Sequence, residues 1–289
     1  MPTLVKKVQS LEKTKLNRAA QFLVLCGILA IWMIFISSLN LEIKGQEVQV
    51  KENNWSMFGY DLMHSSYSPS KGAMVNQTLW KFNTGGPVDA PVVVQGIVYF
   101  GSLDDKVYAL NASSGKIIWN FTTGANVLSP VAVAEGKVYV GSEDFHVYAL
   151  DAATGDYVWS YKTGYFVDSA VAYFDGLVYA ASEDQSIYAL NASDGELVWS
   201  YQTGGQIMLS SPIIEGGKVF VGSQDHLLYA LNATTGSLLW TYLTNDEIVS
   251  TPTATNGIVY VGSNDQYVYA INTSNGELIW KYKTNGPVF

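Results

Sequence analysis

Length, composition and charge exclude several classes of protein. The chain has 289 residues, of which 48% are hydrophobic and 13% aromatic, so it is not a disordered protein and it can bury a large core. The first eighteen residues carry a charge of +4 and the remainder carries −13, which gives the net charge of −9. Because the only arginine, Arg18, belongs to the basic tail, the acidic remainder lacks the positive surface that nucleic-acid binding requires.

An uncharged segment follows the basic tail of residues 1–18. Residues 19–39 form a run of 21 residues without a charged side chain, which matches the ~20 residues of a transmembrane helix. The run is longer than the apolar region of a signal peptide, which favours a retained anchor over a cleaved one. Lysines before it and glutamates after it place the N-terminus in the cytoplasm and the rest outside. Residues 40–53 are a polar linker.

Residues 54–289 contain a repeat of about forty residues. Its clearest frame runs from Ala149 to Trp159 and returns at Ala109–Trp119, Ala189–Trp199, Ala230–Trp240 and Ala270–Trp280. With Trp80, successive tryptophans are 39, 40, 40, 41 and 40 residues apart. Such a period with strand-like content indicates a radial or stacked repeat.

Each copy is expected to form four short strands. In the second copy, the β-rich segments are Pro130–Val133, Lys137–Ser142, His146–Leu150 and an alternating run with Tyr157, Trp159 and Tyr161. Four antiparallel strands joined by tight turns make one propeller blade. The predicted fold is an all-β propeller with five complete blades, a partial sixth and one preceding transmembrane helix. The blades are 86–123, 125–163, 165–203, 205–244 and 246–284.

The residues that recur in each copy are expected to have structural roles. The tryptophans are large enough to join adjacent sheets, and the alanine ten residues earlier is expected to leave room for a neighbouring blade's indole. Glycines in the second strand of four copies indicate a close neighbour, and an aspartate after that strand is expected to cap its turn. These docking tryptophans are Trp80, Trp119, Trp159, Trp199, Trp240 and Trp280; the glycines are Gly101, Gly141, Gly222 and Gly262, with Ala181 in the third copy; the aspartates are Asp104, Asp144, Asp184, Asp225 and Asp265.

The motif Ala-x-Asp/Asn-x-x-x-Gly-x-x-x-Trp resembles the tryptophan-docking motif of the pyrroloquinoline-quinone-like (PQQ-like) β-propeller repeat. The resemblance covers Trp80 to Phe289, and the segment Trp55–His64 is similar to the opening segment of secreted proteins of this group. Families built on this repeat include quinoprotein dehydrogenases, BamB-type assembly scaffolds and sensor ectodomains. The number of blades stays open. A sixth blade would join Trp55–Thr84 to the C-terminal tail, whereas the segment Thr284–Phe289 has the phase of a further copy and favours a truncated larger ring.

A ligand site is expected where the loops before the first strands gather around a central channel. Polar and aromatic residues at this mouth would bind a carbohydrate, a peptide or a cation, although ordinary solvated loops also explain them. The candidate residues are Asp89, Asn126, Tyr165, Phe166, Asp168, Gln206, Asp246 and Glu247.

Metal and nucleophile signals are weak. No His/Cys cluster has metal-ligand spacing, and no serine lies in a nucleophile elbow. Seven Asn-x-Ser/Thr sequons are potential N-glycosylation sites outside the cytoplasm, although a repeated turn that favours asparagine explains several of them. They are Asn54, Asn76, Asn111, Asn120, Asn191, Asn232 and Asn272.

Three functions remain open. The favoured one is a non-catalytic, membrane-anchored binding or scaffolding module for a protein or carbohydrate, without cofactor or metal. The first alternative is a quinoprotein dehydrogenase that uses PQQ and calcium. Many of these enzymes carry an adjacent cysteine pair, and this chain has only Cys26. The second alternative is a sensor ectodomain, although its cytoplasmic tail of eighteen residues would need a partner for output.

Overall fold

The computed structural model describes residues 56–59, 61 and 77–289. The predicted tail, transmembrane helix and linker lie outside the described residues, as do Trp55 and the sequons at Asn54 and Asn76. No helix in the described part of the chain is long and apolar enough to cross a membrane. Asn53–Phe289 forms one compact unit, to which all described residues belong.

Within the described residues, twenty strands form five four-stranded sheets. The first sheet contains β1 (Val92–Val94), β2 (Ile97–Ser102), β3 (Lys106–Asn111) and β4 (Ile117–Thr122). The second contains β5 (Ala132–Ala134), β6 (Lys137–Gly141), β7 (His146–Asp151) and β8 (Tyr157–Lys162). The third contains β9 (Ala172–Phe174), β10 (Leu177–Ser182), β11 (Ser186–Asn191) and β12 (Leu197–Gln202). The fourth contains β13 (Ile213–Glu215), β14 (Lys218–Gly222), β15 (Leu227–Asn232) and β16 (Leu238–Leu243). The fifth contains β17 (Thr253–Thr255), β18 (Ile258–Gly262), β19 (Tyr267–Asn272) and β20 (Leu278–Lys283).

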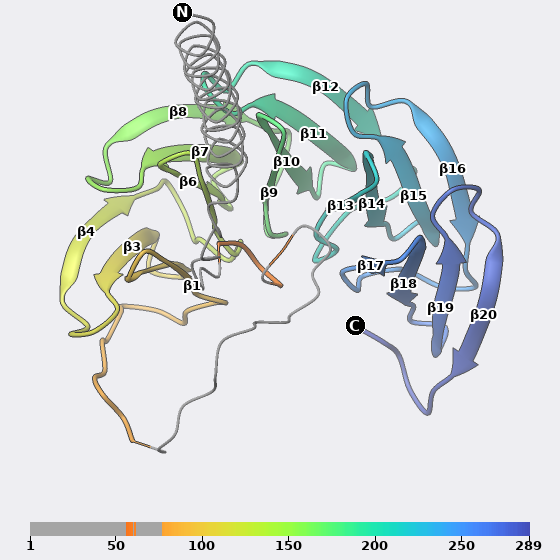
Figure 1. The fold of residues 1–289 in the computed structure, drawn as a ribbon, viewed down its shortest axis with the longest axis horizontal. Coiled ribbons are helices and arrows are strands. Elements are labelled where there is room, and N and C mark those ends of the chain that lie inside the picture. Colours follow the sequence, from red (N-terminus) through yellow and green to blue (C-terminus); the bar gives the residue numbers. More distant parts are fainter. Residues whose placement is uncertain (1–55, 60, 62–76) are drawn as a thin grey trace, which may run out of the picture. The chain divides into compact units, whose positions relative to one another are not determined.

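Every sheet is an antiparallel meander, as the repeat predicts. Figure 1 shows the sheets side by side in chain order, with the short first strands inside and the fourth strands outside. The second strand is buried on both faces, since Val138, Tyr139 and Val140 are all fully buried between neighbouring sheets. The five predicted blades are therefore confirmed.

Tryptophans join consecutive sheets. The indole N–H of Trp119 donates to the carbonyl of Ala152 at 3.0 Å, and its ring lies against Gly155 in the next sheet. The same contact occurs at all four junctions between sheets and between Trp80 and the first sheet, with N···O distances of 2.8–3.1 Å. A Cβ at Gly155 would lie 2.6 Å from the indole, and the φ angle of Gly155 is +79°. Both the lack of space and the backbone conformation therefore require glycine here. The acceptor turns, called docking turns below, are residues 111–115, 151–155, 191–195, 232–236 and 272–276.

The predicted role of the alanine ten residues before each tryptophan is wrong. Ala149 is paired in register with Trp159 of its own sheet, and Ala109, Ala189, Ala230 and Ala270 are paired in the same way. These alanines are fully buried under their own indole, and the neighbouring indole contacts the docking turn instead. The turn is the better acceptor because its carbonyl is not used in a strand ladder.

Glycines of the second strands admit the loop that leads to the next sheet. A Cβ at Gly141 would lie 2.3 Å from Cγ1 of Val167, which belongs to the loop before β9. Gly101 and Gly222 meet Val127 and Ile248 in the same way, as predicted. The segment after β20 repeats this contact, because Val288 lies against Gly262. The described residues form no sixth sheet, and the segment 77–83 contributes Trp80 without forming a strand.

Candidate functional site

The candidate site lies at the end of the sheets where the loops before the first strands meet the turns between the second and third strands. These leading loops are residues 84–91, 123–131, 163–171, 203–212 and 244–252. In each sheet one backbone bond ties the turn to the leading loop, such as Glu143 N–H to the carbonyl of Asn126 at 3.0 Å. Equivalent bonds start from Leu103, Glu183, Gln224 and Asn264. Loops and turns thus form one surface, called the loop face below.

The repeated aspartates fix this face. Asp144 accepts a hydrogen bond from its own turn at His146 N–H, as predicted. It also accepts bonds from the leading loop at Gly124 N–H, 2.6 Å, and from the Tyr148 hydroxyl, 2.6 Å. The aspartate therefore holds turn, strand and loop together, which exceeds the predicted capping role. The corresponding tyrosines at the other four aspartates are Tyr108, Tyr188, Tyr229 and Tyr269.

Two predicted site residues, Asn126 and Asp168, belong to an acidic group with Glu143 and Glu183 on the loop face. The Asn126 amide donates to Glu143 at 2.8 Å. Asp168 is mostly buried, and one of its carboxyl oxygens has no hydrogen-bond partner. Burial, together with the charges of Glu143 and Glu183, raises the pKa of Asp168 to about 7. Burial and Glu143 also raise the pKa of Glu183.

Tyr165 and Phe166 form an aromatic cluster close to Asp168 in the loop before β9. Their ring centroids are 4.4 Å apart, and both rings contact Phe145 at 5.3 and 5.5 Å. Tyr165 is 40% exposed, so the cluster offers an aromatic surface to a ligand. The structure thus brings four predicted residues to neighbouring positions on the loop face.

The remaining predicted residues do not join this group. A carboxyl oxygen of Glu247, in the loop before β17, lies 3.5 Å from the side-chain nitrogen of Gln224, in the turn before β15. The backbone N–H of Glu247 donates to the carboxyl group of Asp246 at 2.9 Å. Gln206 is exposed on the loop before β13. Asp89 lines a small pocket of about 90 Å³ between the first two sheets. Binding by these residues stays a prediction.

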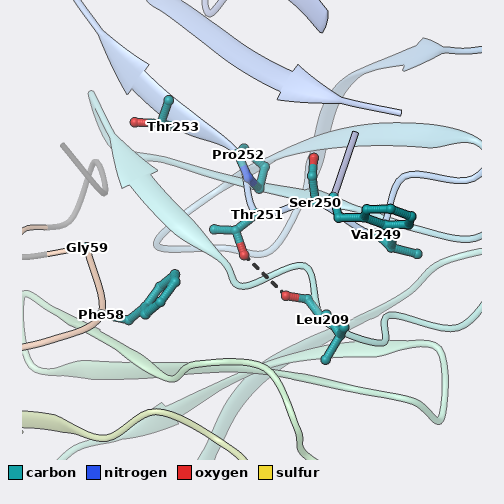
Figure 2. A pocket seen from close by; sticks show the side chains of 9 residues that line it. Phe58, Gly59, Leu209, Val249, Ser250, Thr251, Pro252 and Thr253 are labelled. Atoms are coloured by element: carbon teal, nitrogen blue, oxygen red, sulfur yellow. Dashed lines mark hydrogen bonds between the residues drawn. The ribbon is translucent and has the colours of Figure 1, made fainter. Parts of the chain in front are cut away.

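A larger pocket of about 390 Å³ was not expected from the sequence. Its lining is apolar or hydroxylic and comes from Phe58, Leu209, Phe289 and the loop 249–253 (Figure 2). The Thr251 hydroxyl donates to the carbonyl of Leu209 at 3.2 Å, so the loops before β13 and β17 are linked at the pocket wall. The fourth copy has one extra residue, since Met208 and Leu209 stand where the other copies have a single residue, and this is the sequence signal that could have pointed here.

Glu143, Glu183 and Phe145 are further candidate site residues, which sequence reasoning missed. All three occupy the turn after the second strand. The serine and the aspartate of this turn recur in every copy, and the residues next to them differ between copies. Variation inside an otherwise fixed turn is the signal that could have found them.

The sequons in the docking turns have the expected structural explanation. The side-chain oxygens of Asn111, Asn191, Asn232 and Asn272 accept backbone N–H groups of their own turns at 2.8–3.1 Å. Asp151 does the same in the second sheet, where no sequon exists. Asn120 is exposed on β4.

The described residues do not fit a calcium-dependent quinone site. Within them, no group of three or more His, Cys, Asp or Glu side chains is placed to hold a metal ion. Calcium requires six to eight oxygen ligands, and Glu143, Asp168 and Glu183 do not supply such a set.

These features define a β-propeller repeat protein whose blades are joined by tryptophan docking. The family model described as outer membrane protein assembly factor BamB matches residues 66–203 and 209–288, and the chain belongs to this family. No curated protein sequence matches the chain.

Solved structures with the same fold are longer. The quinohemoprotein alcohol dehydrogenase ADHIIG from Pseudomonas putida HK5 is 22% identical, with a TM-score of 0.70 over 80% of this chain and 48% of that one. BamB from Moraxella catarrhalis is 24% identical, with a TM-score of 0.58 over 65% of this chain and 58% of that one. A europium-containing methanol dehydrogenase is 16% identical, with a TM-score of 0.66 over 80% and 58%. The chain therefore spans about half the length of these proteins, and the likeness concerns the fold.

Proposed function

We propose that this chain is a membrane-anchored, extracytoplasmic propeller that binds a protein partner on its loop face and performs no chemistry of its own. The observation that carries the proposal is the aromatic cluster of Phe145, Tyr165 and Phe166 beside the carboxylates of Asp168 and Glu183. Exposed aromatic rings supply contact area, and carboxylates select cationic groups. Membership of a family described by an assembly factor supports a protein rather than a carbohydrate as the partner.

Site-specific photo-cross-linking tests this proposal. A photoreactive phenylalanine analogue at Tyr165 of the full chain, in its native cells, is expected to give an adduct with one protein. The matched control is the same analogue at Thr234, which is exposed in a docking turn at the opposite end of the sheets. Glu183→Gln is expected to reduce the Tyr165 adduct severalfold. An adduct with a glycan, or equal adducts at Tyr165 and Thr234, would contradict a protein partner on the loop face.

The location of the propeller has a test of its own. The uncharged run of residues 19–39 and the lysines before it support a cytoplasmic N-terminus and an outer propeller. The test uses cells whose outer envelope is permeabilised while the cytoplasmic membrane stays closed. Added protease is expected to degrade the propeller and to leave a tag at the N-terminus intact. Intact-mass measurement of the native protein would report glycans at the sequons, of which Asn111 and Asn120 are exposed in the described part of the chain.

A quinoprotein activity is the second candidate, because the solved dehydrogenases share the fold over 80% of this chain. Incubation of the full chain with PQQ and calcium, followed by dye-linked oxidation of alcohols, decides between the two. We expect no turnover above that of the cofactor alone. Turnover that depends on the protein would replace the binding proposal.

A further inference from the structure

A phenylalanine stands on the loop face at a position where the other copies have polar residues. Phe145 has a φ angle of +74°, in the left-handed region that a bulky side chain rarely adopts. The equivalent residues of the other four turns also have positive φ angles and are Asp105, Gln185, His226 and Gln266. Formation of the turn therefore does not require an aromatic ring here, and such backbone outliers concentrate at functional sites.

The ring of Phe145 joins two consecutive sheets. Phe145 lies in the turn between β6 and β7, whereas Tyr165 and Phe166 belong to the leading loop before β9. Phe145 is stacked on Tyr165, with an angle of 19° between the ring planes, and Phe166 is tilted against both rings. Because Tyr165 stays 40% exposed, these rings present an aromatic surface at the junction of the second and third sheets.

Carboxylates belong to the same segments as these rings. Glu143 precedes Phe145 by two residues in the same turn, and Asp168 follows Phe166 by two residues. The backbone N–H of Glu183 donates to the carbonyl of Phe166 at 3.0 Å. The charges of Glu143 and Glu183 both act on Asp168, so the three carboxylates lie within electrostatic reach of one another.

The loop face carries charge of one sign. Besides the leading loops it contains the turns 103–105, 143–145, 183–185, 224–226 and 264–266. These loops and turns hold twelve aspartates and glutamates and no lysine or arginine. Among the described lysines only Lys281, on β20, lies over aromatic rings, and those rings belong to the fifth sheet. A surface of this kind attracts and orients a cationic partner.

We propose that the partner protein presents an arginine to the junction of the second and third sheets, where its guanidinium group lies against Tyr165 and Glu143, Asp168 and Glu183 supply the opposite charge. A guanidinium group is planar, stacks on aromatic faces and pairs with carboxylates. An ammonium group is a more strongly hydrated point charge, so the aromatic surface favours arginine over lysine. The inference rests on the proposed protein-binding function and names the residue type that the loop face recognises.

Peptide binding to the full chain in detergent micelles tests this inference. The probe is a short fluorescein-labelled peptide in which arginine and serine alternate, and fluorescence anisotropy is expected to show saturable binding. The same peptide with lysine in place of arginine is expected to bind severalfold more weakly. A peptide with citrulline, which has the shape of arginine without its charge, is expected not to bind. Equal binding of the arginine peptide and either analogue, or no binding of the arginine peptide, overturns the proposal.

Variants of the rings assign the contact to the aromatic surface. Tyr165→Ala is expected to weaken binding of the arginine peptide about 3- to 10-fold, since it removes an exposed cation–π contact. Phe145→Gln is expected to weaken binding severalfold by removing the ring on which Tyr165 stacks. This change preserves the turn, because Gln185 occupies the equivalent position with the same φ angle of +74°. Unaltered affinity in both variants, each with a wild-type melting temperature, overturns the proposal.

A matched pair of charge variants separates a local contact from general attraction. Glu183→Gln is expected to weaken binding of the arginine peptide severalfold. Asp105→Asn removes one negative charge from the loop face in the first sheet, and asparagine tolerates a positive φ angle. This control is expected to leave the affinity unchanged at physiological ionic strength, because salt screens distant charges. Equal weakening by both variants would mean that the whole acidic face attracts the peptide, and overturns the proposal.

Competition in the photo-cross-linking experiment separates this inference from the proposed function. Excess arginine peptide is expected to suppress the protein adduct at Tyr165, and the lysine peptide is expected to do so less effectively. A protein adduct that persists unchanged in excess arginine peptide overturns the arginine contact and leaves the loop-face proposal standing. Failure of the loop-face proposal has a different result, namely a glycan adduct or equal adducts at Tyr165 and Thr234.

Discussion

Among single residues, the aspartates of the second turns couple the fold to pH. Burial works against ionisation of Asp265, but hydrogen bonds from Tyr269 and from Asn245 N–H lower its pKa below the ordinary 3.8. The pKa of Asp104 is lowered by Tyr108 and Gly85 against the same opposition. A carboxyl whose folded-state pKa is lowered contributes stability above its unfolded pKa and loses it as the pH falls.

The corresponding prediction concerns acid unfolding. The free energy of unfolding in urea is expected to fall as the pH is lowered from about 5 through the unfolded aspartate value near 3.8 and below. Asp265→Asn is expected to destabilise the protein at pH 6 and to make this decline shallower. A decline in the variant as steep as in the wild type would show that the aspartate is not responsible.

The pKa of Asp168 is shifted in the opposite direction, so its effect on stability has the opposite dependence on pH. Because its folded-state pKa is about 7 and its ordinary value is 3.8, the stability that it contributes when protonated is lost as the pH rises from 3.8 to about 7. Asp168→Asn is therefore expected to raise the melting temperature more at pH 8 than at pH 5, where only part of this stability has been lost. Differential scanning calorimetry at both values measures this, and an equal shift at pH 5 and pH 8 would refute the charge argument.

At the scale of elements, the junction between a second strand and the following loop has no spare space. Gly141→Ala places a methyl group 2.3 Å from Val167 Cγ1 and 2.4 Å from its carbonyl oxygen, and we expect a loss of about 1–3 kcal/mol in unfolding free energy. Gly286→Ala is the matched control, because nothing lies within 4 Å of its Cβ position. Equal stabilities of the two variants in urea titrations would contradict the close approach.

The repeat predicted the elements well because their causes are local. Alternation around Trp159, the β-rich run from Lys137 and the glycine at 155 each act within one sheet, and all three are where the sequence placed them. The segment on which each indole docks was predicted wrongly, because that segment belongs to the next sheet. A β-bulge after Ala149, repeated in every sheet, was also missed, since it depends on pairing between strands.

The site was predicted less completely than the fold. Asn126, Tyr165, Phe166 and Asp168 were singled out because the loops that carry them vary between copies, and the structure places them near one another. Glu143 and Glu183 belong to a different segment of the repeat, and only the backbone bonds between turn and loop bring them beside Asp168. The pocket around Phe58 and Phe289 joins residues from the two ends of the compact unit, which no local pattern can reveal.

For the propeller as a whole, the account depends on tryptophans that link each sheet to the next. Trp199 is 8% exposed and donates to the Ala233 carbonyl, whereas Trp280 on β20 is 45% exposed. Truncation of a buried tryptophan typically costs about 3–5 kcal/mol, and truncation of an exposed one much less.

The most direct test compares Trp199→Ala with Trp280→Ala in the same urea titration. We expect Trp199→Ala to lower the free energy of unfolding by about 3–5 kcal/mol, and Trp280→Ala to lower it by less than about 1 kcal/mol. Equal losses, or a larger loss at Trp280, would contradict the docking of each indole on the following sheet.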